Sequence, residues 1–242
     1  MTSLAVNLIQ AKNIHLPQTR YLKGVKSPHS NMLKRGKQNK KLGDKITVKK
    51  WKGMTMYSLT LEERATCPTD CQQWENCYGN NMPFAHRFDH TDPSFKPMLE
   101  LQLEQLNRKH PEGFVVRLHV LGDFYDGLYI TSWQLWLHKF ENLHVFGYTH
   151  HESESQLGSM IGNINRLHPD RFRIRFSDDP KVDFSAFTEK DENGATHSRP
   201  RYTREGGHQE VIICPEQAGK TNSCATCGYC WSSDRPIVFI EH

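Results

Sequence analysis

The sequence lacks any apolar run approaching the ~20 residues that a membrane-spanning helix needs. Its N-terminal segment also lacks the basic start and long apolar stretch of a secretory signal peptide. We therefore expect no membrane partner and a cytoplasmic protein. In that reducing compartment the seven cysteines are not expected to form disulfides, and an odd number fits a disulfide framework poorly.

Acidic residues are nearly absent between residues 20 and 52, where twelve Lys or Arg residues accompany a single acid, Asp44. This stretch has a charge of +11, so the rest of the chain has −7 to give the total of +4. A basic arm before a mildly acidic body favours attraction to a polyanion, and nucleic acid is the expected partner. The alternative is a solvated leader, because the arm has few aromatic side chains for base stacking.

Helical and strand-like patterns alternate with short loops in the middle of the chain. Strands and helices are predicted, in chain order, at 54–60, 94–113, 114–121, 128–140, 143–150, 155–169 and 172–177. This alternation is typical of βαβ units with a mostly parallel sheet, so we predict an α/β fold.

Composition divides the chain into three parts. We expect a basic N-terminal arm at 1–53 and an α/β body with the first cysteine loop at 54–180. The remainder, 181–242, begins with a polar stretch to about residue 210 that we interpret as an extended excursion or lid, and it ends in a cysteine-rich segment.

Three predicted strands alternate apolar with polar side chains, although strands of parallel sheets are usually apolar on both faces. The polar positions are Arg117 and His119, then His144, Tyr148 and His150, then Arg173, Arg175 and Ser177. Because successive side chains point to opposite faces, these residues predict one polar concave wall. An open sheet with one face in water is the alternative. Ligands of such folds bind where the strands end, here at Gly122-Asp123, Thr149-His150-His151 and Ser177-Asp178.

The cysteines form two groups, Cys67-x3-Cys71-x5-Cys77 and Cys214-x9-Cys224-x2-Cys227-x2-Cys230. The C-x2-C-x2-C core of the second group is the spacing by which one loop wraps an iron–sulfur cube. Cys214 is the fourth ligand of this group or else completes the first group. Zinc is the alternative metal, although zinc sites usually use two separated C-x2-C pairs.

The first group offers three thiolates on a loop after a strand. Three thiolates can hold three irons of a [4Fe–4S] cluster and leave the fourth iron open, and an open position distinguishes a reactive metal site from a structural one. A structural zinc site completed by His86 or His90 is the alternative reading.

This order of features resembles the radical S-adenosylmethionine (SAM) enzymes, in which a three-cysteine loop follows the first strand of a partial (β/α) barrel. Here strand 54–60 leads into the first cysteine group, and strand 114–121 ends in LGDFYDG at the position of that family's Gly-Gly-Glu turn. The resemblance implies a partial (β/α) barrel, a [4Fe–4S] cluster chelating SAM, and an auxiliary cluster on the C-terminal cysteines. The motifs CP…C…CYGNN, GDFY and C..C..CW also resemble a cysteine-rich family of phage and prophage proteins, which implies a prokaryotic or phage-infected host cell but no reaction.

The radical SAM resemblance implies roles for individual residues. Cofactor contacts are expected from Gly122, Asp123, Tyr148, Thr149, Arg175 and Ser177, and catalytic roles from Asp123, His119, His150 and Arg175. An electron donor would reduce the cluster, which would cleave SAM to a radical that abstracts hydrogen. The arginines of the polar wall would favour an anionic substrate, and together with the basic arm they suggest a nucleotide or nucleic-acid-related substrate.

Two other functions are compatible with the sequence. A zinc-stabilised nucleic-acid-binding protein would use the cysteines only for structure. A divalent-metal-dependent hydrolase or nuclease would use Asp123, Asp126, His150, His151 and Glu152.

Overall fold

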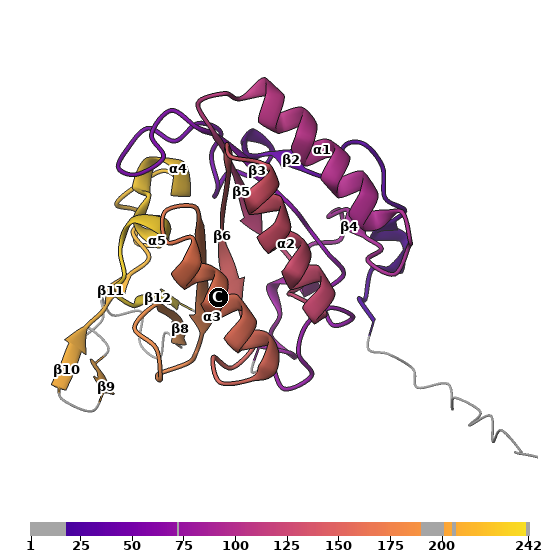
Figure 1. Ribbon diagram of the computed structural model, residues 1–242. Coiled ribbons are helices and arrows are strands. Elements are labelled where there is room, and N and C mark those ends of the chain that lie inside the picture. The colour runs from indigo at the N-terminus through magenta and orange to yellow at the C-terminus, as the bar shows by residue number, and fades with distance from the viewer. Residues whose placement is uncertain (1–17, 72, 190–200, 205–206, 241–242) are drawn as a thin grey trace, which may run out of the picture.

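The computed structural model describes residues 18–71, 73–189, 201–204 and 207–240 (Figure 1). An eight-stranded sheet forms its centre, with the strand order β11-β12-β8-β7-β6-β5-β3-β2. The strands are β2 Lys34–Arg35, β3 Thr55–Ser58, β5 Phe114–Leu118, β6 Leu143–Thr149, β7 Phe172–Ser177, β8 Ser185–Glu189, β11 Ile212–Ile213 and β12 Ile237–Ile240. Every neighbouring pair is parallel except β2 with β3.

Three helices cover one face of this sheet: α1 Phe95–Lys109, α2 Gly127–Lys139 and α3 Gln156–Leu167 (Figure 1). Asp126 and Ser155 begin α2 and α3 by accepting hydrogen bonds from free backbone N–H groups of the first turn. Alternate strand residues, such as Val116, Val145 and Ile174, pack with the helices into the largest buried cluster.

The opposite face of the sheet is covered by segments from both ends of the described chain. The short helices α4 Cys224–Cys227 and α5 Tyr229–Ser232 lie here with the residues around Ile46. Trp51 stacks on Trp231 with ring centroids 5.4 Å apart, and the Trp231 indole N–H donates to the Lys50 carbonyl at 3.0 Å. The part of the basic arm near Trp51 is therefore packed against the cysteine-rich segment.

The remaining elements are small. β1 Val25–Lys26 pairs in parallel with β4 Arg87–Phe88, and β9 Arg201–Arg204 pairs antiparallel with β10 Gly207–Glu210. Short 3-10 helices occur at Leu22–Gly24, Gly36–Gln38 and Tyr78–Asn81.

The predicted α/β class and mostly parallel sheet are confirmed. Within the described residues β2 and β11 end the sheet at opposite edges and no strand pairing joins them, so a closed barrel is not seen. The interpretation of the whole 181–210 stretch as an excursion or lid was wrong at Ser185–Glu189, because β8 lies between β7 and β12 in the sheet. Its buried residues Ser185, Ala186 and Phe187 sit among polar neighbours that conceal the strand pattern. Part of the expected lid, 190–200, and the first residues of the expected arm, 1–17, lie outside the described residues.

Candidate functional site

The first cysteine group lies in a loop at the carboxyl edge of the parallel sheet. The chain of β3 stays beside that of β5 past the end of both strands, because the N–H groups of Leu59 and Leu61 donate to the carbonyls of Arg117 and Leu121 at 3.2 and 3.0 Å. The chain then leaves the sheet, passes through Cys67, Cys71 and Cys77, and closes in the 3-10 helix Tyr78–Asn81. The three thiols therefore follow the first parallel strand, at the edge where ligands of such folds bind.

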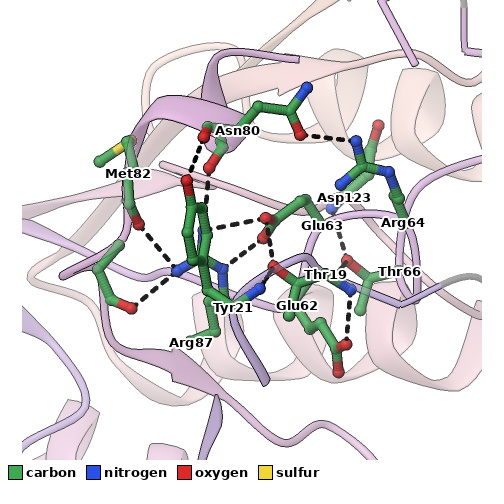
Figure 2. A network of polar contacts seen from close by, with 12 residues as sticks. Thr19, Tyr21, Glu62, Glu63, Arg64, Thr66, Asn80, Met82, Arg87 and Asp123 are labelled. Atoms are coloured by element: carbon green, nitrogen blue, oxygen red, sulfur yellow. Dashed lines mark hydrogen bonds and ion pairs between the residues drawn. The ribbon is translucent and has the colours of Figure 1, made fainter. Parts of the chain in front are cut away.

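A buried ion pair closes the base of this cysteine loop (Figure 2). Arg87 Nε and Nη2 donate to the two Glu63 carboxylate oxygens at 2.6 and 2.9 Å, and both side chains are at most 1% exposed. Burial raises the pKa of Glu63, but hydrogen bonds from Arg87 and Thr19 outweigh it and hold the pKa below its usual range. Arg87 also donates to three carbonyls after the cysteines, those of Gly79, Met82 and Ala85.

The residues directly after Cys77 complete this closure. Gly79 packs against Glu63, and a Cβ at Gly79 would lie 3.2 Å from the Glu63 carboxyl carbon. The Asn80 carboxamide accepts from Arg64 Nη2 at 2.7 Å and donates to the Glu75 carbonyl at 2.9 Å, so it ties the two halves of the loop together. Polar contacts therefore fix the shape of the cysteine loop, as the close view shows (Figure 2).

The three thiols share one electrostatic environment. Burial raises the pKa of Cys67 and Cys77 and raises that of Cys71 to about 11, and the charges of neighbouring thiols and of Asp123 raise the pKa of Cys67 and Cys71 further. The guanidinium of Arg64 acts in the opposite direction on Cys77. A nearby positive charge, such as that of a bound metal, would favour the deprotonated form of these thiols.

A cavity opens beside Cys71 at the carboxyl ends of β6 and β7. Its wall consists of Asp70, Cys71, His150, Glu152, Ser177, Asp178, Asp179, Pro180 and Lys181. The Asp178 carboxylate accepts from the Thr188 N–H at 2.7 Å through Oδ1, whereas Oδ2 is buried without a hydrogen-bond partner among the described residues. Burial raises the pKa of Asp178. With four carboxyl groups and one lysine, the cavity suits a ligand that brings hydrogen-bond donors or positive charge.

Asp123 lies near the thiols, but its carboxylate accepts hydrogen bonds from backbone N–H groups. Oδ1 accepts from the Phe124 N–H and Oδ2 from the His150 N–H, both at 2.7 Å, so the loops after β5 and β6 are joined through this buried side chain. Its own N–H donates to Thr66 Oγ1 at 3.1 Å, which links it to the cysteine loop. A Cβ at Gly122, where φ is +81°, would lie 2.5 Å from the same Thr66 oxygen. Gly122 and Asp123 thus position the site.

The other predicted site residues separate into two places. His150 and Ser177 line the cavity. Thr149 is buried at the end of β6, and its hydroxyl oxygen accepts from the His151 N–H at 3.2 Å. Arg175 and Tyr148 lie under the cysteine-rich segment, where the Arg175 guanidinium contacts backbone carbonyls.

His119 does not share a face with Arg117, contrary to the predicted alternation. β5 ends at Leu118, and the His119 ring turns toward the helices, where Nε2 lies 2.9 Å from the Tyr129 hydroxyl. Burial lowers the pKa of His119 well below its usual value, so its ring is neutral.

The residues predicted for the hydrolase alternative do not all lie at the cavity. Asp126 caps α2 through the Tyr129 N–H, and His151 Nε2 lies 2.6 Å from the Phe124 carbonyl. Only His150 and Glu152 of that set line the cavity.

The C-terminal cysteines lie under the other face of the sheet. Cys214, Cys227 and Cys230 are 4, 9 and 7% exposed. Cys214 and Cys230 belong to one cluster of buried residues, and Cys224 packs against it. The structure therefore places Cys214 with the C-terminal group.

The basic stretch divides between two places: its start contacts the first cysteine loop, where the Tyr21 hydroxyl donates to the Asn80 carbonyl, whereas its end lies away from the cavity. A hairpin from Ile46 to Met54, closed by the Ile46 N–H to the Met54 carbonyl at 3.0 Å, covers the amino ends of the strands, where Trp51 contacts His144 of β6. The cavity lies at the carboxyl ends.

Sequence reasoning missed several residues of this site. Asp70, Asp179 and Lys181 line the cavity, and their positions next to Cys71 and just after β7 were the available signal. No sequence pattern indicated that Glu63 and Arg87, which are 24 positions apart, form an ion pair.

No group of three or more His, Cys, Asp or Glu side chains in the described part of the chain is arranged to hold a metal ion. None of the helices described here is both long enough and apolar enough to cross a membrane.

Residues 31–233 match the family described as gene product 88. The chain belongs to that family. This assignment agrees with the phage-protein resemblance of the cysteine motifs. No curated protein and no solved structure matches the chain.

Proposed function

We propose that this member of the gene product 88 family is an iron–sulfur enzyme of the radical SAM type. A [4Fe–4S] cluster would be held by Cys67, Cys71 and Cys77, with SAM and the substrate in the adjoining cavity. The observation that supports this most is that Cys71 forms part of the cavity wall where the parallel strands end. Ligands of parallel α/β folds bind at this edge.

The residues present suit such a cluster. Three thiols and no fourth cysteine in the loop leave one iron without a protein ligand, and thiolates are the usual ligands of iron–sulfur clusters. Arg64 Nη1 is buried without a hydrogen-bond partner among the described residues, and its charge acts on Cys77, which favours an anionic group here. When bound and reduced, such a cluster supplies an electron to SAM.

The strand order supports the same proposal. From β3 through β5, β6, β7 and β8 to β12, sheet neighbours follow one another in chain order, and three of the connections contain a helix on the same face. This is the order of a (β/α) barrel, so we interpret the open sheet as part of one.

The chain's own residues would bind and orient the reactants. Glu152 and Asp178 can accept hydrogen bonds from an ammonium group and from ribose hydroxyls, and His150 can exchange a proton with a bound group. The acidic wall favours the base or ribose of a nucleotide-related substrate over its phosphate. An external electron donor is required.

Anaerobic purification of the full chain, with an absorption spectrum and counts of iron, sulfide and zinc, tests the proposal. We expect Cys71→Ala to lose the iron of the first site and reductive SAM cleavage, while Thr69→Ala, at an exposed position of the same loop, keeps both. Zinc instead of iron, lost on Cys71→Ala, would contradict the proposal and favour a structural site.

A second candidate function is nucleic-acid binding through the hairpin at the amino edge. Lys45, Lys49 and Lys52 are exposed there, and no carboxylate pairs with them among the described residues. If each contacts one phosphate, changing all three to Gln should reduce the slope of log affinity against log salt by about 3. An unchanged slope in a DNA or RNA titration, with the same change at Lys96, Lys109 and Lys220 as control, would rule this contact out.

A further inference from the structure

The outer side of α2 exposes two large apolar side chains in line. Leu128 is 71% exposed and Leu135 is 61% exposed. They are seven positions apart, so they lie on the same side of the helix, and seven is the spacing with which helices pack against one another along a seam. Figure 1 shows α2 between α1 and α3 on the outside of the sheet. The two leucines therefore stand at the centre of the helix layer.

The helices α2 and α3 carry very little charge in a protein in which 24% of residues are charged. Among Asp, Glu, Lys and Arg, α2 contains only Lys139 and α3 only Arg166, and each lies in the last turn of its helix. Lys139 Nζ is paired with the Glu100 carboxylate of α1 at 2.6 Å. Depletion of charged residues distinguishes the core of a protein interface from the rest of a surface.

The hydroxyl groups between the two leucines already have hydrogen-bond acceptors within their own helix. Thr131 Oγ1 donates to the Gly127 carbonyl and Ser132 Oγ to the Leu128 carbonyl, both at 2.8 Å. Burial of this side of α2 would therefore leave neither hydroxyl donor without an acceptor, so its cost is low. Ser132 is also small, which lets a second helix approach closely at this point.

The leucines are placed symmetrically about the small residue. Ser132 lies next to the midpoint between Leu128 and Leu135 in the sequence. If a two-fold axis passes beside Ser132, α2 packs antiparallel to α2 of a second copy. Leu128 of each copy then meets Leu135 of the other, which is the reciprocal contact that a two-fold interface requires.

The charges at the ends of the two helices favour the same arrangement. Both helices run in the same direction, because they follow parallel strands. Asp126 precedes α2 and Glu152 precedes α3, whereas Lys139 and Arg166 lie in the last turns. Antiparallel packing brings the acidic end of each copy beside the basic end of the other, whereas parallel packing would bring like charges together.

We infer that the outer side of α2, with Leu128, Thr131, Ser132 and Leu135, is the contact surface between two copies of this chain. The copies are related by a two-fold axis beside Ser132. The outer sides of α1 and α3 extend the contact, since a stable interface takes about 800 Å² from each partner. This inference does not depend on the function proposed for the first cysteine loop.

Light scattering on the full chain during size-exclusion chromatography, at several loading concentrations, tests the inference. The natural sequence should have twice the 28.1 kDa mass of one chain. Leu135→Glu should have the mass of one chain, because the interface would bury two carboxylates beside leucines. Leu135 is mostly exposed, so this variant should fold, and urea unfolding checks that it does.

Leu22→Glu is the matched control. Leu22 is 56% exposed in the 3-10 helix directly before β1, which pairs with β4, so this variant should remain dimeric. A single-chain mass for the natural sequence at every concentration would overturn the inference and leave the α2 surface to a different protein. Dissociation by Leu22→Glu but not by Leu135→Glu would overturn it as well.

Ser132→Cys tests the position of the two-fold axis. Mild oxidation should link two copies of this variant through the new thiols, because residues beside a two-fold axis lie close to their symmetry mates. Ser159→Cys, at an exposed position of α3, should link much less, and the natural sequence measures any contribution of its own cysteines. Equal linking in the two variants would overturn the placement of the axis at Ser132.

Discussion

The three cysteines of the first group are all partly exposed and one of them, Cys71, lines a cavity, whereas three of the four C-terminal cysteines are at most 9% exposed and lie under the sheet. An accessible group with three thiols suits a metal that must also bind a substrate, and a closed group with four suits a metal that must not. Identical side chains in one chain thus lie in different surroundings.

The two groups are also held in place by different forces. The first loop is fixed by polar contacts, above all Glu63 with Arg87. The second segment is fixed by aromatic packing between Trp51 and Trp231 and by Arg175 on backbone carbonyls. Changes at one group should therefore leave the packing around the other in place.

Glu63→Gln should have the largest effect. It leaves the Arg87 charge buried without a counter-ion, and removal of one partner of a buried pair costs about 3–5 kcal/mol. Urea unfolding measures this cost. Glu104→Gln, which removes a surface i,i+4 pair with Arg108, should cost no more than about 0.5 kcal/mol. If the two variants were equally stable, the buried pair would not be what fixes the first loop.

Asp123→Ala should rank second. This change removes the hydrogen-bond acceptor of the Phe124 and His150 N–H groups. Two buried donors without a partner should lower the free energy of unfolding by about 2–4 kcal/mol. The matched change Asp126→Ala removes a helix cap and should cost about 1 kcal/mol. A loss of SAM cleavage without any loss of stability in Asp123→Ala would instead assign Asp123 a catalytic role.

The sequence predicted most of the frame that both groups share. α1, α2 and α3 and the strands β5, β6 and β7 were anticipated from periodicity, because each has a regular apolar pattern. β8 was missed because only Ser185, Ala186 and Phe187 are buried within a polar stretch, too few to produce a pattern. Spacing separated the cysteines into two groups but left open whether Cys214 belongs to the second group or completes the first.

What the sequence could not provide is the partner of each polar residue. Arg175 was expected to face a substrate, yet its guanidinium contacts carbonyls of a segment about 55–60 positions later. Asp123 was expected to contact a cofactor, whereas its carboxylate accepts a hydrogen bond from the His150 N–H. In both cases the sequence predicted where the residue lies relative to the strands. It did not predict the backbone groups that the side chain binds, because tertiary packing brings them there and periodicity does not encode that packing.

As the pH falls, the packing around the C-terminal cysteine group should be destabilised before that around the first group. Burial lowers the pKa of His144 to about 4, and its ring packs on Trp51, which stacks on Trp231. Because the unfolded chain binds this proton near pH 6.5, stability is full above that pH and falls as pH drops toward 4, by about 2–3 kcal/mol. His144→Gln should flatten this part of the stability profile, measured by urea unfolding at several pH values. A wild-type profile that is flat between pH 6.5 and 4 would show that His144 titrates normally.

Thr66→Val should have the smallest effect and the most local one. The Thr66 hydroxyl accepts from the Asp123 N–H and donates to the Glu62 carbonyl, so it joins the first loop to the end of β5. Its loss should cost about 1–2 kcal/mol, while Thr131→Val on α2, where the hydroxyl bonds only within its own helix, should change stability by less. If the first loop holds the proposed cluster, its iron should also leave faster under a chelator in Thr66→Val than in Thr131→Val, because Thr66 contacts the loop and Thr131 does not. Equal release from the two variants would mean that the Thr66 hydroxyl does not help to fix the loop.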